Sequence, residues 1–240
     1  MRFLGLLSLT TAFAALCGCA VFPGQAQLSP GATPQVAALP DGTSLRYMQF
    51  VPAAYHGGKA PLLIFLHGSG EAGGDVFKVM TNGPWNYAKA HAEFPFIVVA
   101  PQLLVDGEWN PEQLKAWLED VEARLPVDRR RIYLTGLSRG GGGTWDFAMR
   151  YPDLFAAIAP VSGYSNLKQP CGLKGVGIWA FHGAKDDIVP IADEAALVDR
   201  ARACGVDINY TIYPEGNHNA WDATYSDPTL YAWLLSHERP

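Results

Sequence analysis

Short runs of apolar residues alternate along the chain with segments in which apolar positions recur every three or four residues. The runs are rich in β-branched and aromatic side chains and predict strands at 62–66, 96–100, 131–135, 156–161, 176–181 and 208–213. Most of them are apolar throughout, which is typical of a sheet that is buried on both faces. A further run at 44–51 predicts an antiparallel hairpin strand at the edge of that sheet.

Helical periodicity fills the intervals between these strands. A proline stands in the first turn of 111–124, and apolar residues such as Leu114 and Trp117 share one side of that segment. Further helices are predicted at 140–150, 191–203 and 228–237. Strands that alternate with helices define the α/β class and predict a doubly wound, mostly parallel sheet flanked by helices.

Composition and charge narrow the classes of function. The 240 residues are 49% hydrophobic, which suffices for one core, and no internal repeat or second block of composition divides the chain. Its 18 Lys and Arg stand against 23 Asp and Glu, for a net charge of -5 without a basic block. Nucleic acid is therefore not an expected partner.

The amino terminus carries an export signal. Residues 3–15 form an apolar run after Met1-Arg2, with the n-region and h-region of a bacterial signal peptide. The following Leu16-Cys17-Gly18-Cys19 resembles the lipobox of bacterial lipoproteins. The resemblance implies a lipoprotein-type signal peptide over 1–19, with Cys19 diacylated as the first mature residue, and Ala20 after it implies the outer membrane in a diderm organism. Two alternatives stay open, namely ordinary cleavage after Ala20 or Ala26 and retention as a membrane anchor.

The segment after the signal predicts a flexible tether. Residues 21–40 contain four prolines and no charge, so we expect a tether over 20–40 and a folded domain over 41–240. Of the four cysteines, Cys171 and Cys204 remain after removal of the signal. In an oxidising compartment these two could form a single disulfide, or they could be two buried thiols.

One motif lies between a predicted strand and a predicted helix, at Gly136-Leu137-Ser138-Arg139-Gly140. G-x-S-x-G in this context places a serine hydroxyl on a tight turn at the carboxyl edge of the sheet, so Ser138 is the candidate nucleophile. The alternative, a phosphate-binding loop, would need a Lys-Ser/Thr pair that the segment lacks.

A serine hydroxyl needs a base and an acid that orients the base, and both follow downstream. Asp186 and Asp187 come after the strand at 176–181, and His218 comes after the last strand. The order Ser, Asp, His is that of α/β-hydrolases. His237 also follows the acid, but it stands in a predicted surface helix. No His, Cys and carboxylate spacing indicates a metal site.

From 62 to 237 the chain resembles the phospholipase/carboxylesterase group of α/β-hydrolases, near predicted-peptidase esterases and related to dienelactone hydrolase-like and polyhydroxybutyrate depolymerase-like esterases. The resemblance rests on His67-Gly68-Ser69-Gly70-Glu71, Gly-Leu-Ser-x-Gly at Ser138, His-Gly-x-x-Asp-x-x-Val-Pro at 182–190 and Gly-x-His-x-Ala-Trp at 216–221. It implies an α/β-hydrolase fold with Asp186 as the acid, although either carboxylate of the pair could orient an imidazole.

The α/β-hydrolase pattern implies the positions of the oxyanion hole, and loop positions suggest residues of the pocket. Backbone N–H groups of Ser69 and Arg139 occupy the two donor positions, and Arg139 departs from the Met or Gln often found there. Three tryptophans near loops are candidate pocket residues: Trp85, Trp109 and Trp221. The interval between the strands ending near 161 and beginning near 176 is too short for a large lid domain.

These features predict a serine carboxylesterase for small or short-acyl esters, which needs no cofactor. A peptidase or acyl thioesterase of the same fold is one alternative, and a catalytically silent cell-envelope binding protein is another. The expected partner is a small-molecule ester, with membrane contact only through the lipid anchor. The expected location is the cell envelope, or otherwise the periplasm or the medium.

Overall fold

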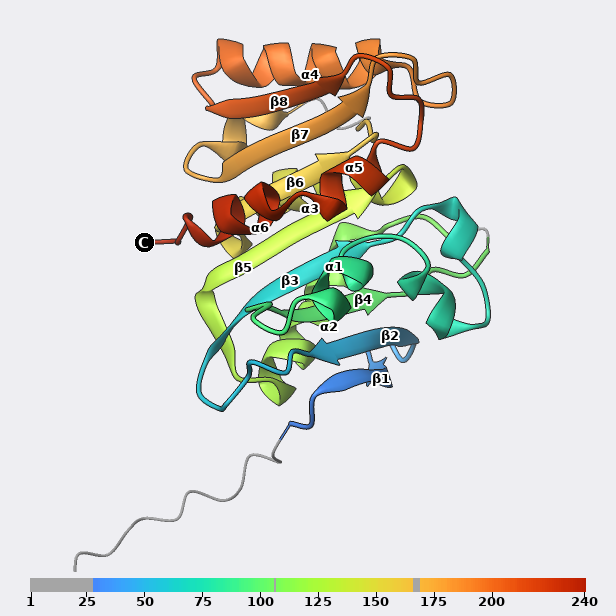
Figure 1. The fold of residues 1–240 in the computed structure, drawn as a ribbon, viewed down its shortest axis with the longest axis vertical. Helices are drawn as coiled ribbons and strands as arrows, with labels where there is room; N and C mark the ends of the chain where they lie inside the picture. The colour runs from blue at the N-terminus through green and yellow to red at the C-terminus, as the bar shows by residue number, and fades with distance from the viewer. Residues whose placement is uncertain (1–27, 106, 166–168) are drawn as a thin grey trace, which may run out of the picture.

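The computed structural model describes residues 28–105, 107–165 and 169–240, and its centre is one eight-stranded sheet (Figure 1). The strand order is β1-β2-β4-β3-β5-β6-β7-β8. The strands are β1 (Gly31–Ala38), β2 (Ser44–Val51), β3 (Ala60–Leu66), β4 (Ile97–Pro101), β5 (Val127–Leu137), β6 (Ala157–Val161), β7 (Gly177–Gly183) and β8 (Ile208–Tyr213). β1 and β2 are antiparallel to their neighbours, and the other pairs are parallel.

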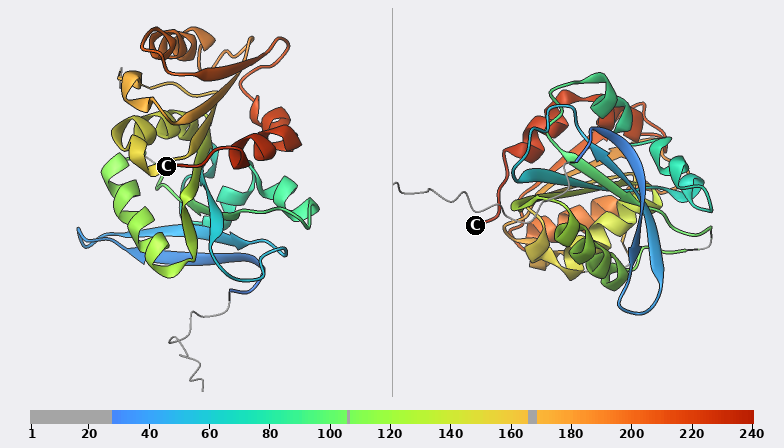
Figure 2. Two further views of the ribbon diagram at one scale, coloured as in Figure 1. Left: turned by 90° about the vertical axis from the view of Figure 1, so that its left-hand side faces the viewer. Right: turned by 90° about the horizontal axis from the view of Figure 1, so that it is seen from below.

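Helices cover both faces of the sheet (Figure 2). The helices of one face are α2 (Pro111–Arg124), α3 (Arg139–Arg150) and α4 (Ile191–Ala203), and those of the other are α1 (Trp85–Ala90), α5 (Trp221–Ser226) and α6 (Pro228–Leu235). Each face has its own buried apolar cluster, one including Trp117, Trp145 and Leu197 and the other Trp85 and Tyr231. The doubly wound, mostly parallel architecture predicted from the sequence is thereby confirmed.

Side-chain caps mark where two of the helices, α2 and α6, begin. The side chain of Asn110 accepts a hydrogen bond from the Gln113 N–H at 2.9 Å, and Pro111 follows it at the first position of α2. Asp227 caps α6 in the same way through the Thr229 N–H at 2.8 Å. Four short 3₁₀ helices lie in the loops: η1 (Ser69–Glu71), η2 (Val76–Met80), η3 (Pro152–Leu154) and η4 (Pro170–Leu173).

The expected tether over 20–40 is wrong for its carboxyl-terminal part. Residues Gly31–Ala38 form β1, which pairs in register with β2 from Gly31 opposite Val51 to Ala38 opposite Ser44. The folded domain therefore begins before Asp41. An edge strand needs few buried side chains, and in β1 only Ala37 is buried, so the segment lacks the apolar run that marks the other strands.

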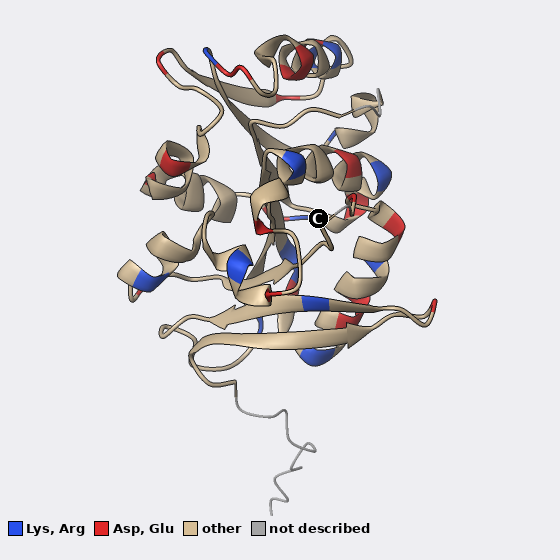
Figure 3. Cartoon of the chain, turned by 90° about the vertical axis from the view of Figure 1, so that its right-hand side faces the viewer, with Lys and Arg blue, Asp and Glu red and all other residues tan. Residues whose placement is uncertain are grey.

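The predicted signal peptide 1–19 and its Cys19 lie outside the described residues. Within the described part of the chain, no helix has the length and apolar character needed to cross a membrane. Acidic and basic side chains are interspersed over the helices and loops in the view of Figure 3, which agrees with the absence of a basic block in the sequence.

Candidate active site

Ser138 stands at the turn between β5 and α3, with φ 54° and ψ -120°. This is one of two non-glycine residues with positive φ among those described, and such a conformation persists only where the surroundings hold it. The Ser138 N–H donates to the carbonyl of Val161 at 2.9 Å, and the Gly142 N–H donates to the carbonyl of Ser138 at 3.1 Å. A Cβ at Gly140 would overlap the carbonyl oxygen of Leu66, so only glycine permits the turn to pack this closely against β3.

His218 joins Ser138 to Asp186. Its Nε2 lies 2.9 Å from Ser138 Oγ, and its Nδ1 lies 2.8 Å from Asp186 Oδ2. A carboxylate only accepts hydrogen bonds, so Nδ1 carries the hydrogen and Nε2 is free to accept the serine proton. The structure brings together the three residues that the sequence singled out, in the arrangement of a nucleophile, a base and an orienting acid.

Asp186, and not Asp187, contacts the histidine. The side chain of Asp186 is fully buried, and its Oδ1 accepts from the N–H groups of Ile188 and Val189, each at 2.9 Å. Burial by itself would raise the pKa of the Asp186 carboxyl, but the hydrogen bonds from His218, Val189 and Ile188 outweigh it and lower that pKa. Asp187 is exposed, and α4 begins after Pro190 without a side-chain cap, so Asp187 does not cap that helix.

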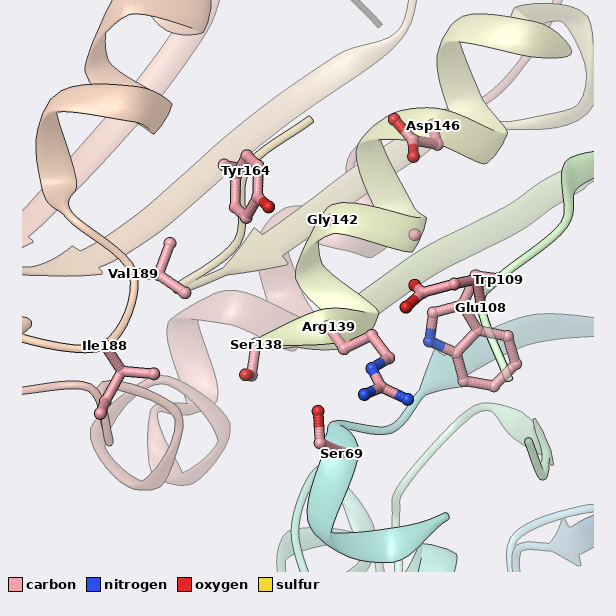
Figure 4. A pocket seen from close by; sticks show the side chains of 11 residues that line it. Ser69, Glu108, Trp109, Ser138, Arg139, Gly142, Asp146, Tyr164, Ile188 and Val189 are labelled. Carbon is pink, nitrogen blue, oxygen red and sulfur yellow. The ribbon is translucent and has the colours of Figure 1, made fainter. Parts of the chain in front are cut away.

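Ser69 and Arg139 lie beside Ser138 around one opening (Figure 4). Each begins a helix, η1 for Ser69 and α3 for Arg139. Within the described ranges, neither backbone N–H donates a hydrogen bond to another residue, so both stay available to a substrate oxygen. Gly68 brings the η1 loop close, since a Cβ placed there would be 3.4 Å from that of Ser138.

A cavity of about 290 Å³ adjoins these groups. Its walls combine an aromatic ring, Trp109, with three charged side chains, Glu108, Arg139 and Asp146. Arg139 donates from Nη1 to the carbonyl of Gly107 at 2.8 Å, which holds its guanidinium along the wall. Burial raises the pKa of Asp146, which also hydrogen-bonds to Ser165. The remaining lining includes Tyr164, Ile188 and Val189.

Of the three predicted pocket tryptophans, only Trp109 lines this cavity. The prediction that Trp85 lines the pocket is wrong. Its side chain is 1% exposed, donates from Nε1 to the carbonyl of Val79 at 2.7 Å and packs edge-on against Phe65 in the core. Trp221 packs edge-on against the His218 ring, with 5.2 Å between centroids, and lines a second cavity of about 360 Å³ between α1 and α5.

The other histidines have structural positions. His67 is buried, donates from Nδ1 to the carbonyl of Gly68 at 2.6 Å and accepts at Nε2 from the Leu103 N–H at 3.0 Å. His237 follows α6 and packs against Gly177, at the opposite end of β7 from the site. Among the described residues, no group of three or more His, Cys, Asp and Glu could hold a metal ion.

Two structural features outside the cavity were missed or left open in the sequence. Cys171 in η4 and Cys204 after α4 form a disulfide with 5.3 Å between their Cα atoms. Glu194 of α4 is fully buried beside His182. Its helical spacing to Leu197, Val198 and Ala201, all of them buried, is the signal that could have identified it.

Comparisons with known proteins agree with the fold. No family model matches the chain. A solved thermostable esterase aligns with a TM-score of 0.76 and 30% identity over 87% of this chain and 63% of its own length. An acylaminoacyl peptidase aligns with a TM-score of 0.66 over 87% of this chain and 42% of its own length. Its sequence identity of 16% means that this similarity supports the fold alone.

Sequence relatives are esterases and a depolymerase. Feruloyl esterase C of Emericella nidulans is 30% identical over 64% of this chain and 59% of its own length. Poly(3-hydroxyalkanoate) depolymerase C of Paucimonas lemoignei is 27% identical over 50% of this chain and 31% of its own. The chain thus spans less than two thirds of these relatives. It has the α/β-hydrolase fold, as predicted from the order of its motifs, and it is similar in sequence and structure to esterases.

Proposed function

We propose that the chain is a serine carboxylesterase that hydrolyses small or short-acyl carboxylic esters. The observation that carries the proposal is the hydrogen-bonded series Ser138, His218 and Asp186 beside two unpaired backbone N–H groups. The similarity to a feruloyl esterase and to a thermostable esterase supports an ester as the substrate.

In the proposed reaction, His218 Nε2 takes the proton of Ser138 Oγ while Oγ bonds to the ester carbonyl carbon. The carbonyl oxygen becomes an oxyanion, which the N–H groups of Ser69 and Arg139 stabilise, and losing one such donor costs about 3–4 kcal/mol in the barrier. The intermediate then collapses, the C–O bond to the alcohol breaks, and the alcohol leaves with the proton from His218. Water repeats the sequence on the acyl-enzyme and releases the acid.

The size and polarity of the cavity support a small ester. About 290 Å³ beside Ser138 is at the lower end of the range for ligand pockets, and its charged groups disfavour a long alkyl chain. The indole of Trp109 and the ring of Tyr164 on opposite walls suit a planar acyl group as well as a short aliphatic one (Figure 4).

The test is hydrolysis of p-nitrophenyl esters of increasing acyl length, together with methyl ferulate, by the chain from Ala20 onward. We expect turnover that falls as the acyl chain lengthens, and a loss of at least about 10⁴-fold in kcat for Ser138→Ala. Competition with peptide and thioester substrates separates the alternatives, and preferential peptide cleavage would contradict an esterase. A folded protein whose Ser138 does not react with a fluorophosphonate would favour the silent binding protein.

We also propose that the chain is exported and lipid-anchored through Cys19. The lipobox-like Leu16-Cys17-Gly18-Cys19 supports the anchor, and the Cys171–Cys204 disulfide supports an oxidising compartment. Cys19→Ser should move the full chain from the membrane fraction to the soluble fraction of the cell envelope. An unchanged distribution would argue for a different anchor or for none.

A further inference from the structure

A second carboxylate–imidazole pair, Glu194 and His182, lies next to Asp186. His182 is the last residue but one of β7, Glu194 lies in the first turn of α4, and both side chains are fully buried. His182 Nδ1 is 2.6 Å from Glu194 Oε2, and Trp145 Nε1 donates to the other carboxylate oxygen, Oε1, at 2.9 Å. None of these three side chains lines the cavity beside Ser138.

The other nitrogen of His182 faces the acid of the triad. His182 Nε2 is 2.9 Å from the carbonyl oxygen of Val189 and 3.2 Å from Asp186 Oδ2. Both oxygens are acceptors, so Nε2 must carry a hydrogen. In a neutral imidazole the single hydrogen could equally stand on Nδ1, which would turn the Nε2 lone pair toward two oxygens. The two oxygens therefore favour the Nε2–H form, and a compatible constraint on the Nδ1 side can hold the ring in place.

Glu194 supplies that constraint. A contact of 2.6 Å between Nδ1 and a carboxyl oxygen needs one proton between them, so together with Nε2–H the pair holds two protons, either as an imidazolium with a carboxylate or as a neutral ring with a protonated Glu194. Burial lowers the pKa of His182, but the hydrogen bond and charge of Glu194 outweigh it and raise that pKa. Burial also raises the pKa of Glu194. The raised pKa values of His182 and Glu194 both favour a proton held between the two side chains.

The hydrogen bonds form a closed path through the molecule. They run from Ser138 through His218 to Asp186 and from His182 through Glu194 to Trp145, and the two parts meet where His182 Nε2 lies 3.2 Å from Asp186 Oδ2. Ser138 precedes the first residue of α3, and Trp145 lies farther along the same helix. One rigid helix thus holds both ends of the path.

We propose that His182 and Glu194 are positioning residues for the triad: Glu194 anchors the His182 ring through Nδ1, so that Nε2–H stays directed at the Val189 carbonyl and the adjoining Asp186 carboxylate, which is thereby held toward His218. The proposal rests on the proposed esterase function. Asp186 Oδ2 receives the N–H group of His218 and lies 3.2 Å from His182 Nε2, while Oδ1 receives two backbone N–H groups. Three donors and the His182 contact surround the carboxylate and limit its orientation, and a shift of about 1 Å in such a group can cost about 10²-fold in rate.

The test compares Glu194→Gln with Glu194→Leu. The glutamine carbonyl can accept from Trp145 and its amide can donate to His182 Nδ1, which preserves the tautomer without the charge. Leucine keeps most of the volume but makes neither bond. We expect Glu194→Gln to keep kcat within about threefold and Glu194→Leu to lose about 10- to 100-fold, with KM for p-nitrophenyl acetate unchanged because neither side chain touches the substrate.

Turnover is counted per Ser138 that reacts with a fluorophosphonate, so molecules that fail to fold do not enter kcat. Asp193→Leu is the matched control, because it removes the neighbouring exposed carboxylate of the same helix turn and should leave kcat unchanged. Equal kcat in both Glu194 variants overturns the proposal, whether both match the wild type or both fall together.

A second pair of variants tests the imidazole itself and covers the case in which Glu194→Leu does not fold. The amide of His182→Gln can reach the place of Nε2 and donate to Asp186, whereas the shorter His182→Asn reaches only the place of Nδ1. We expect kcat to be about tenfold higher in the glutamine variant, and equal values overturn the proposal. A wild type that neither reacts with the probe nor turns over esters would contradict the proposed esterase function. A wild type that does both, with equal kcat in the paired variants, would contradict only the positioning role of His182 and Glu194.

Discussion

At the scale of single residues, Asp186 has the most constrained environment of the site. Its carboxylate is buried, accepts two backbone N–H groups and lies against two imidazoles. Its folded-state pKa is lowered from the ordinary value of 3.8. A carboxyl whose pKa falls on folding stabilises the folded state above the unfolded-state pKa, and this stabilisation disappears as the pH falls through the folded-state pKa.

Asp186→Asn should therefore lower the free energy of unfolding near neutral pH and have less effect in acid. The difference between wild type and variant should shrink as the pH falls below the ordinary carboxyl pKa of 3.8 and through the lower folded-state pKa, because the wild-type carboxyl becomes protonated and loses its ionic hydrogen bonds. Urea denaturation at a series of pH values measures this difference. A difference that stays constant over the whole range would show that Asp186 stays equally ionised in both states.

Sequence reasoning reached Ser138, Asp186 and His218 because their positions after strands and their order follow from how a parallel sheet works. The motif spacing did not indicate Glu194, which lies in a helix where a glutamate is usually exposed. Trp85 was misassigned for a related reason. A tryptophan near a loop can point outward or inward, and here its N–H finds the carbonyl of Val79 in the interior.

At the scale of elements, strong periodicity gave good boundaries. The predicted bounds of α2, α4, β2 and β8 agree with the structure at both ends. The short helices α1 and α5 and the strand β1 were missed. Six-residue helices carry too few turns for a periodic pattern, and β1 is exposed along most of its length.

Removing β1 provides a prediction about this edge. A chain that begins at Leu28 keeps β1, whereas a chain that begins at Leu39 leaves β2 as an unpaired edge and loses the bond from Arg124 to the carbonyl of Val36. We expect the shorter chain to be less stable by about 2 kcal/mol or more, which is a fall of about 4–8 °C in Tm for a domain of this size.

Calorimetry of the two truncated chains measures the difference. The chain from Leu28 should match the chain from Ala20 in Tm, which serves as the control for the removal of upstream residues. Equal Tm values for the chains from Leu28 and Leu39 would mean that the pairing of β1 with β2 adds nothing to the stability of the domain.

At the scale of the whole molecule, one covalent cross-link joins two elements of the carboxyl-terminal half. The Cys171–Cys204 bond closes a loop with a sequence separation of 33 and ties η4 to the end of α4. A loop of this length loses enough entropy in the unfolded state to stabilise the folded chain by about 3–4 kcal/mol in the chain-entropy account.

Replacing both cysteines by serine should lower the free energy of unfolding by about 2–4 kcal/mol. Dithiothreitol should lower the Tm of the wild type to about that of the double variant and leave the Tm of the double variant unchanged. Esterase activity below the transition should persist in both, since the bond lies away from the cavity beside Ser138. A reductant that shifts neither protein would mean that the cross-link does not constrain the unfolded chain.

The chain order of the site has a consequence for the timing of activity during synthesis and refolding. His218 lies 80 residues after Ser138 and 32 after Asp186, beyond the last parallel strand. Contacts of such long sequence separation are slow to form. On the proposed function, a nascent chain should stay inactive until its emerged part extends past residue 218, and turnover should return on refolding only after the segment that follows β8 has reached the site.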